Sequence, residues 1–301
     1  MFSSDDFNHD SGSLEAYILG SEVVKNFLKY VERHDVCPEY AADIRKALQI
    51  CDLAVEEKRL LMDLVTALPG SFNNAATVMF TGNEEKSPFE FDNYGQFNGL
   101  GGSLDEDKAR LIFGVNIAMQ LKLEQGKRIA AALEEKTLTV TETEDMTLEV
   151  IEISYPDQER RSKYSAANRC LAGELEIEPC GSVTLRSTSI KDGKDTSDAD
   201  AVLGVATDDM EVAFFLEKSI LKLLKIGMKL RVKVCTLNEG IRFIKALKAV
   251  YPTYYTFLPQ QLMLNYKEPT PYNRRAPNVH DYDEDGRLKG PEQEDENVIE
   301  E

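Results

Sequence analysis

The spacing of apolar residues changes along this chain, and that change limits the fold more than any other feature. Over residues 14–80 apolar side chains recur every three or four positions, which is typical of amphipathic helices. Residues 229–234 instead alternate strictly, with Leu230, Val232 and Val234 on one side, as in a strand. The two periods together predict an α+β fold: an N-terminal helical layer followed by a mixed sheet covered by helices.

Composition divides the chain into four parts. Residues 1–13 are short, polar and acidic, and 268–301 are rich in proline, asparagine and acidic residues with few aliphatics, so both are predicted to be disordered. Between them we expect a helical region over 14–100 and a mixed α/β region over 101–267. These two regions are also compatible with one continuous domain.

Capping residues predict where the helices begin. Ser21, Asp52 and Ser71 are placed to cap helices, and Pro38 suits the first position of another. A capping box from residue 103 to 106 precedes a segment that is apolar nearly all round, which predicts a helix buried at the centre of a domain. Further expected elements are helices over 207–224 and 238–250 and strands over 137–141, 148–153, 174–177 and 183–186.

Several classes of protein are disfavoured by composition. No run approaches the roughly 20 apolar residues of a membrane span, and the N-terminus lacks the order of a signal peptide. Five cysteines without a C-x-x-C pair indicate a reducing compartment, so we expect the nucleus and cytoplasm and no membrane. The three histidines offer no pair at zinc spacing, and the glycine-rich 99–102 lacks the P-loop frame. We therefore expect no metal and no cofactor.

The densest group of reactive residue types lies at residues 34–40, H-D-V-C-P-E-Y. A cysteine nucleophile needs a base and a group that orients the base, so His34, Asp35 and Cys37 are candidates. Residues this close along a chain rarely reach one another across a site. The alternative is a tight connection between helices, in which Asp35 caps, Pro38 starts the helix and Cys37 packs inward. The sequence favours this alternative, and we expect no catalytic residue.

Charge is distributed unevenly. The net charge is −18, yet residues 216–248 hold nine Lys and Arg against two Glu, a balance of +7. In the tail, residues 280–301 hold ten carboxylates against one Arg and one Lys, a balance of −8. If the basic residues share one surface, it would attract an anion such as RNA, an acidic partner or the tail. The alternative is three separate solvated faces. The nine are Lys218, Lys222 and Lys225 on an expected helix, Lys229, Arg231 and Lys233 on a strand, and Arg242, Lys245 and Lys248 on a second helix.

Three segments carry a resemblance to a known family. They are His34, Asp35, Val36, Cys37, Pro38, Glu39 and Tyr40, then I-C-D-L-A at 50–54, then L-P-G-S-F-N at 68–73. Together they resemble the argonaute-binding subunit of the fungal argonaute siRNA chaperone complex. The resemblance implies a non-catalytic subunit that binds argonaute loaded with duplex small RNA, together with a second argonaute-binding subunit. It further implies restraint of slicing and of passenger-strand release, in RNA interference and heterochromatin assembly. The alternative function is an RNA-contacting accessory module that uses the basic 216–248 surface.

Overall fold

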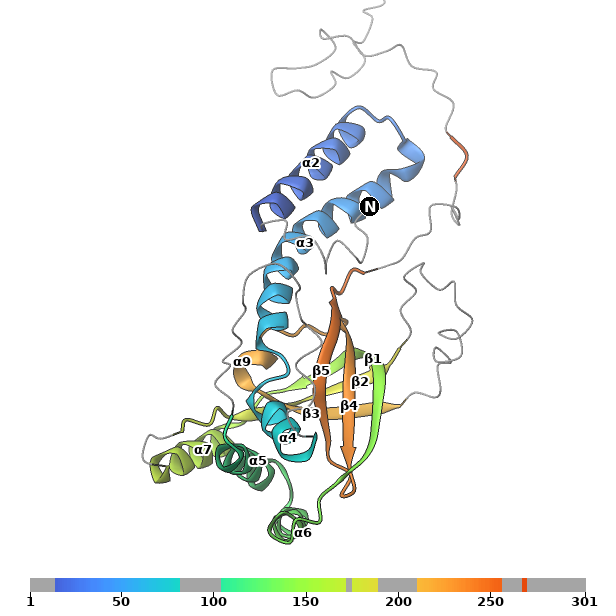
Figure 1. Cartoon of the computed structure of the whole chain (residues 1–301). Coiled ribbons are helices and arrows are strands. Elements are labelled where there is room, and N and C mark those ends of the chain that lie inside the picture. Colours follow the sequence, from blue (N-terminus) through green and yellow to red (C-terminus); the bar gives the residue numbers. More distant parts are fainter. Residues whose placement is uncertain (1–13, 82–103, 172–174, 189–209, 256–266, 270–301) are drawn as a thin grey trace, which may run out of the picture. The chain divides into compact units, whose positions relative to one another are not determined.

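The computed structural model describes residues 14–81, 104–171, 175–188, 210–255 and 267–269 (Figure 1). The chain forms two compact units, one of residues 1–14 and 56–259 and the other of residues 15–55 and 260–301. Helices and a five-stranded sheet are both present, so the predicted α+β class is confirmed. The sheet is antiparallel throughout rather than mixed as predicted, because Glu211–Glu217 and Arg242–Tyr251 are strands where crossover helices, which parallel strands usually need between them, were predicted. The predicted disordered segment 1–13 and all but residues 268 and 269 of the acidic tail lie outside the described residues.

A helical hairpin forms the described part of the second unit. It consists of α2 (Leu14–Arg33), the 3-10 turn η1 (Pro38–Tyr40) and the first half of α3 (Ala41–Ala67). The predicted new helix at Asp52 is wrong, since α3 runs through this position without a break. Asp52 is an exposed side chain within the helix, where it forms an ion pair with Lys25 of α2. No proline or glycine lies between positions 39 and 68 to interrupt the helix near Asp52.

The sheet of the first unit has the strand order β3-β2-β1-β4-β5, and every neighbouring pair is antiparallel. The strands are β1 (Val140–Ser154), β2 (Cys180–Ser187), β3 (Glu211–Glu217), β4 (Lys229–Leu237) and β5 (Arg242–Tyr251). The long β1 pairs with β4 through its first part and with β2 through its second part. The two predicted strands 137–141 and 148–153 are therefore one element.

The sheet is curled into an incomplete barrel. Its edge strands β3 and β5 run in the same direction and approach each other, although no ladder joins them. A long first strand paired on both sides, in the order 3-2-1-4-5, is the arrangement of the five-stranded OB barrel, a partly open Greek-key barrel. Figure 1 shows α4 in front of this open seam.

Two hydrophobic cores lie on the two faces of the sheet. The inner face packs against the end of α3 and the short α9 (Lys218–Leu221), with Leu64, Leu221 and Val232 fully buried. The outer face is covered at one end by the other helices, which bury Phe113 and Phe243. These helices are α4 (Ser71–Thr81), α5 (Glu106–Gln120), α6 (Leu123–Glu134) and α7 (Gln158–Cys170). Alternation along β4 supplies both cores, because successive side chains point to opposite faces.

Three predicted elements of the second half are wrong. The expected helix 207–224 is β3 followed by the four-residue α9, and the expected helix 238–250 is a hairpin turn followed by β5. Residues 175–177 form no strand, because the side-chain amide of Asn168 bonds both the N–H and the carbonyl of Ile177 at 3.0 Å. The predicted strand at 183–186 lies within β2 and is confirmed.

The helix expected to be central is buried on one face only. α5 buries Ile112, Phe113 and Ile117, whereas Leu111 is 39% exposed. It ends at Gln120, and α6 is a separate amphipathic helix that the sequence interpretation missed. The N-cap residue of α5 is Asp105, whose side chain makes no capping hydrogen bond, and the first residue of the predicted capping box, at position 103, lies outside the described residues.

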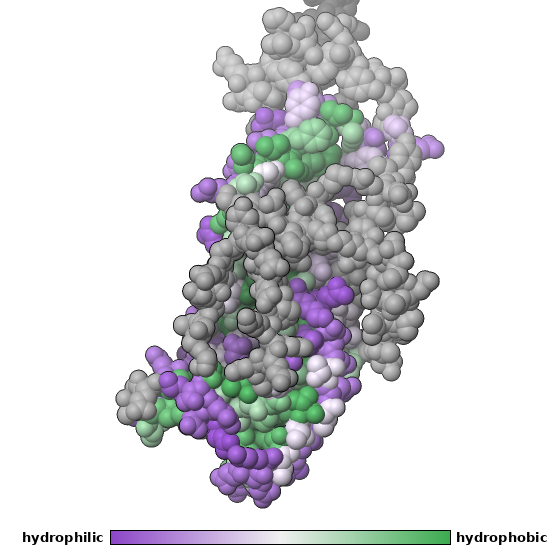
Figure 2. Space-filling view, viewed as in Figure 1, coloured by the Kyte–Doolittle hydropathy of each residue, from purple (hydrophilic) through white to green (hydrophobic). Residues whose placement is uncertain are grey.

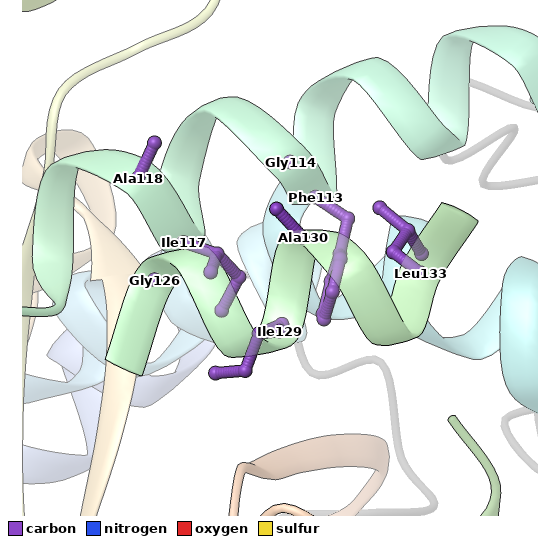
Figure 3. A pocket seen from close by; sticks show the side chains of 8 residues that line it. All are labelled: Phe113, Gly114, Ile117, Ala118, Gly126, Ile129, Ala130 and Leu133. Carbon is purple, nitrogen blue, oxygen red and sulfur yellow. The ribbon is translucent and has the colours of Figure 1, made fainter. Parts of the chain in front are cut away.

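A small apolar cavity of about 50 Å³ lies between α5 and α6 (Figure 3). Its lining includes Gly114 and Gly126, which lie inside the two helices. A Cβ atom built on either glycine meets nothing within 4 Å. Gly181 of β2 differs, because a Cβ there would collide with the backbone oxygen of Ser154.

Gly126→Ala should therefore raise the free energy of unfolding by about 0.5–1 kcal/mol. The new methyl group has room, favours the helix and reduces the freedom of the unfolded chain. Gly181→Ala serves as the matched control and should lower stability, since the backbone of β1 has to move. Urea unfolding of both variants checks this, and a destabilised Gly126→Ala would contradict it.

Candidate functional site

The apolar face of α2 is turned to solvent. Four residues at helical spacing are more than half exposed, and we call them the α2 stripe: Leu19 (63%), Val23 (62%), Phe27 (63%) and Tyr30 (57%). Figure 2 shows hydrophobic side chains gathered over α2. The helical spacing predicted for this segment is therefore correct, but much of the apolar face is not buried. The predicted cap at Ser21 is wrong, since α2 begins at Leu14 and Ser21 lies inside it. Ser21 is the only buried residue among the described positions of α2.

The H-D-V-C-P-E-Y segment forms the turn of the hairpin. Asp35 adopts a left-handed conformation (φ +50°), its N–H bonds the carbonyl of Glu32, and the N–H of Val36 bonds that of Val31. This pair of bonds is the Schellman ending of a helix, in which the left-handed residue is most often glycine or asparagine. Pro38 then starts η1. The predicted connection is confirmed, with Asp35 ending α2 rather than capping the next helix.

The same segment holds a later part of the chain. Tyr40 Oη accepts the N–H of Lys267 at 2.6 Å, and the ammonium of Lys267 lies 5.1 Å from the centre of the Tyr40 ring. That ammonium also donates to the carbonyl of Glu39 at 3.1 Å and to Asp43 at 2.7 Å. The hydrogen bond from Lys267 and its positive charge lower the pKa of the Asp43 carboxyl. His34, the candidate base for Cys37, packs against the ring of Tyr30, with 4.2 Å between ring centroids.

The L-P-G-S-F-N segment fixes the start of α4. Leu68–Pro69 is a cis peptide, and Gly70 has φ +87°. A Cβ on Gly70 would collide with the carboxylate of Glu217, so this position requires glycine for space as well as for conformation. The Phe72 N–H donates to Glu217 Oε1 at 2.7 Å, so a buried carboxylate from β3 takes the place of a local helix cap.

Asn73 connects the two edge strands of the barrel. Its side-chain amide donates to the carbonyl of Phe215 in β3 at 3.1 Å and to that of Pro69 at 2.8 Å. Its Oδ1 accepts the N–H of Ile244 in β5 at 2.9 Å. Asn73 is fully buried. One side chain thereby occupies the place of a ladder bond between β3 and β5.

The nine basic residues do not share two helical faces, because the helices predicted for them do not form. Lys229, Arg231 and Lys233 do lie on one side of β4, as predicted. Two of them stand opposite carboxylates of β1, since Lys229 pairs with Glu149 and Lys233 with Asp145 in the ladder. The remaining members lie on α9, after it, or on β5: Lys218, Lys222, Lys225, Arg242, Lys245 and Lys248. Anion binding by the nine stays a prediction.

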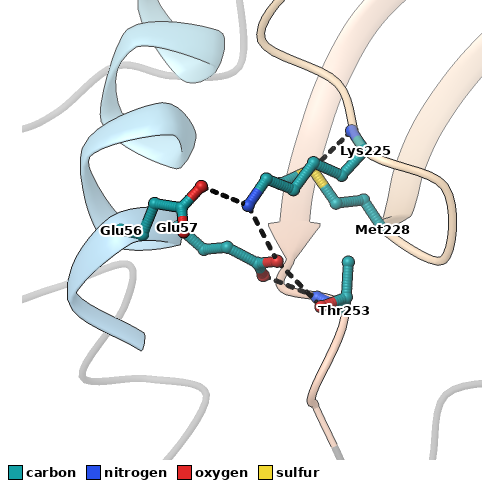
Figure 4. Close-up of polar contacts among 5 residues, drawn as sticks. All are labelled: Glu56, Glu57, Lys225, Met228 and Thr253. Carbon is teal, nitrogen blue, oxygen red and sulfur yellow. Dashed lines mark hydrogen bonds and ion pairs between the residues drawn. The ribbon is translucent and has the colours of Figure 1, made fainter. Parts of the chain in front are cut away.

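Lys225 belongs to a structural cluster (Figure 4). Its ammonium bonds Glu56 at 2.7 Å and lies 3.7 Å from Glu57, both on α3. Glu57 is buried and accepts two bonds from Thr253, from the N–H at 2.9 Å and from the hydroxyl at 2.8 Å. The cluster thus fixes the end of β5 and the segment before β4 to α3.

Comparison with protein families decides which family these features belong to. The model of the Argonaute siRNA chaperone (ARC) complex subunit Arb1 matches residues 2–269. The chain belongs to the Arb1 family. No curated protein and no solved structure matches it. The match confirms the resemblance carried by the three segments, and the family is that of a subunit of the chaperone complex.

The contacts in the structure explain two of the three segments that resemble the Arb1 family. H-D-V-C-P-E-Y closes the hairpin and holds Lys267, and L-P-G-S-F-N supplies the buried contacts of Asn73 and Phe72. Sequence reasoning missed Glu217, the acceptor of the Phe72 N–H, and Glu57, the acceptor of two bonds from Thr253, since a buried carboxylate has no local signature. Among the described residues no group of three His, Cys, Asp or Glu could hold a metal ion. Nor is any helix in the described ranges long and apolar enough to cross a membrane.

Glu217 should make the stability of this Arb1-family chain depend on pH. Burial raises the pKa of its carboxyl, and the Phe72 N–H opposes this only in part. Because this pKa is higher in the folded state than in the unfolded state, the protonated Glu217 carboxyl stabilises the fold fully below the ordinary glutamate pKa of about 4.3. That stabilisation is lost as the pH rises through the folded pKa. Glu217→Gln keeps an acceptor for the Phe72 N–H and carries no charge. Its free energy of unfolding relative to wild type should therefore increase as the pH rises from about 4.3 through the folded pKa of Glu217. Urea unfolding between pH 4.5 and 8 measures the difference, with the exposed Glu176→Gln as control. Parallel curves for Glu217→Gln and wild type would contradict this.

Proposed function

We propose that this chain is a non-catalytic subunit that binds argonaute loaded with duplex small RNA through the α2 stripe. By holding argonaute it restrains slicing and release of the passenger strand, acting with a second argonaute-binding subunit. The setting is RNA interference and heterochromatin assembly, in the nucleus and cytoplasm. Family membership supports the complex, and the stripe is the observation that supports a protein-binding surface.

The stripe favours a protein partner for two reasons. Apolar side chains that lie together in solvent mark interaction sites when they form a contiguous patch. Phe27 and Tyr30 are also of the types that act as anchors in interfaces. A helix that presents such residues at i, i+4 and i+8 suits a groove or a second helix on the partner.

The alternative of an RNA-contacting module has less support. A phosphate-binding surface needs clustered Lys and Arg. Carboxylates of β1 stand opposite two of the three basic residues on β4.

The test compares two exposed apolar positions in a titration of argonaute loaded with duplex small RNA. Phe27→Asp, in the stripe, should weaken binding by about 30-fold or more, the effect of losing an interface anchor. Leu123→Asp, which changes an equally exposed residue of α6, should leave binding within about threefold. Slicing by argonaute should be restrained by the wild-type chain and by Leu123→Asp, and released with Phe27→Asp. Equal binding by the two variants would reject the stripe as the argonaute surface.

A further inference from the structure

Among the described residues, none buries the α2 stripe, whose four members are each more than half exposed. On the side of α2 that faces α3, Ser21 donates to the carbonyl of Cys51 at 3.0 Å, and Glu32 pairs with Arg45 at 3.0 Å. The α2 stripe lies on the other side of the helix. Helices in proteins are stabilised mainly by the packing of an apolar face, so we expect another molecule to pack against the α2 stripe.

Charged residues follow one side of the stripe in an ordered row. Glu15, Glu22 and Lys29 are spaced by seven residues and Arg33 follows four later, so all four lie along the same edge of the helix. Glu15 and Glu22 are in its first half, whereas Lys29 and Arg33 are in its second half. All four are exposed, and none forms an ion pair with another described residue.

We infer that α2 pairs with α2 of a second copy of this chain, antiparallel, across a two-fold axis between Val23 and Phe27. In that arrangement the two stripes cover each other, and the same edges of the two helices come together. Glu22 then faces Lys29 of the second copy and Glu15 faces Arg33, each pair occurring twice by symmetry. In a parallel two-fold pair the opposite edges of the two helices meet, so the charged row of one copy would lie away from that of the other. The antiparallel pair is the arrangement that brings Glu of one row to Lys or Arg of the other.

The pairing goes beyond the proposed function but uses the same surface. A stripe that is covered by a second copy is closed to argonaute, so the dimer has to separate before argonaute binds. The dimer can be measured without argonaute, so failure of one proposal leaves the other standing.

The test is sedimentation of the full-length chain and of charge-reversed variants. Wild type should be a dimer. Glu22→Lys alone and Lys29→Glu alone should each raise the dimer dissociation constant at least about tenfold, because every dimer then holds two pairs of like charges. The double variant should return to within about threefold of wild type. Lys46→Glu, an exposed change on α3, should leave the dimer unchanged.

Mixing the two single variants gives the sharpest result. In a mixed dimer the introduced lysine of one copy faces the introduced glutamate of the other, and the native pair on the opposite side is Lys29 with Glu22. The mixture should therefore dimerise like wild type, whereas each variant alone does not. A monomeric wild type, or single variants that dimerise normally, would overturn the inference. So would a double variant or a mixture that fails to restore the dimer.

Discussion

Replacing Asn73 by alanine will lower the free energy of unfolding by about 3–5 kcal/mol, since a buried group left without its partner costs about 1–3 kcal/mol. The substitution removes the acceptor of the Ile244 N–H and the donor to the Phe215 and Pro69 carbonyls. These groups lie at the seam between β5 and β3, where no ladder bond can replace the lost ones. Urea unfolding with a fixed m-value measures the loss.

The neighbouring residue is a matched control. Asn74 is exposed on the same helix, so Asn74→Ala should change stability by less than about 0.5 kcal/mol. Asn73→Asp keeps Oδ1 for the Ile244 N–H but loses both donated bonds and buries a charge, so it should be no more stable than Asn73→Ala. If Asn73→Ala and Asn74→Ala unfold alike, the amide does not hold the seam.

The helices of the hairpin could be predicted because their signals are local. Proline is favoured at the first position of a helix, where Pro38 stands, and the apolar spacing of α2 and α3 is that of helices. Exposure was not predictable in this way. A periodic stripe shows that a face is apolar but not whether this chain or another molecule covers it, and here α2 turns that face to solvent.

The helix predicted over 238–250 failed because two irregularities in β5 imitate a helical period. The ladder between β4 and β5 shifts its register twice, between Arg231 and Val232 and between Lys233 and Val234. Each shift leaves one residue of β5 unpaired, Lys248 and Lys245 respectively. The result is a repeat of one basic and two buried residues, RFIKALKAV, which has the spacing of a helix. Bulges depend on the partner strand, so a single segment of sequence does not reveal them.

The buried polar sites could not be predicted for a related reason. Asn73 meets Phe215 and Ile244, which are 142 and 171 residues away. Glu217 sits in what reads as the middle of an apolar run, where its charge gives no sign of the Phe72 N–H that it accepts. Such contacts depend on the strand order, and strand order is not written in local periodicity.

Glu57→Ala should lower the free energy of unfolding by about 3–5 kcal/mol, as for a buried charged group whose removal leaves its partners unsatisfied. The side chain is 1% exposed. Without it the N–H and the hydroxyl of Thr253 lose their acceptors, and α3 is no longer bonded to the residue that follows β5 by two positions.

The adjacent glutamate separates burial from ion pairing. Glu56 bonds the same Lys225 at the shorter distance of 2.7 Å, but its side chain is 64% exposed. An exposed ion pair contributes about 0–1 kcal/mol, so Glu56→Ala should cost less than 1 kcal/mol although it removes the closer contact with Lys225. Urea unfolding of the two variants compares them directly, and Thr253→Val, which removes only the hydroxyl donor, should fall between them. Equal losses for Glu56→Ala and Glu57→Ala would mean that the lysine pairing, and not the buried bonds to Thr253, stabilises this part of the fold.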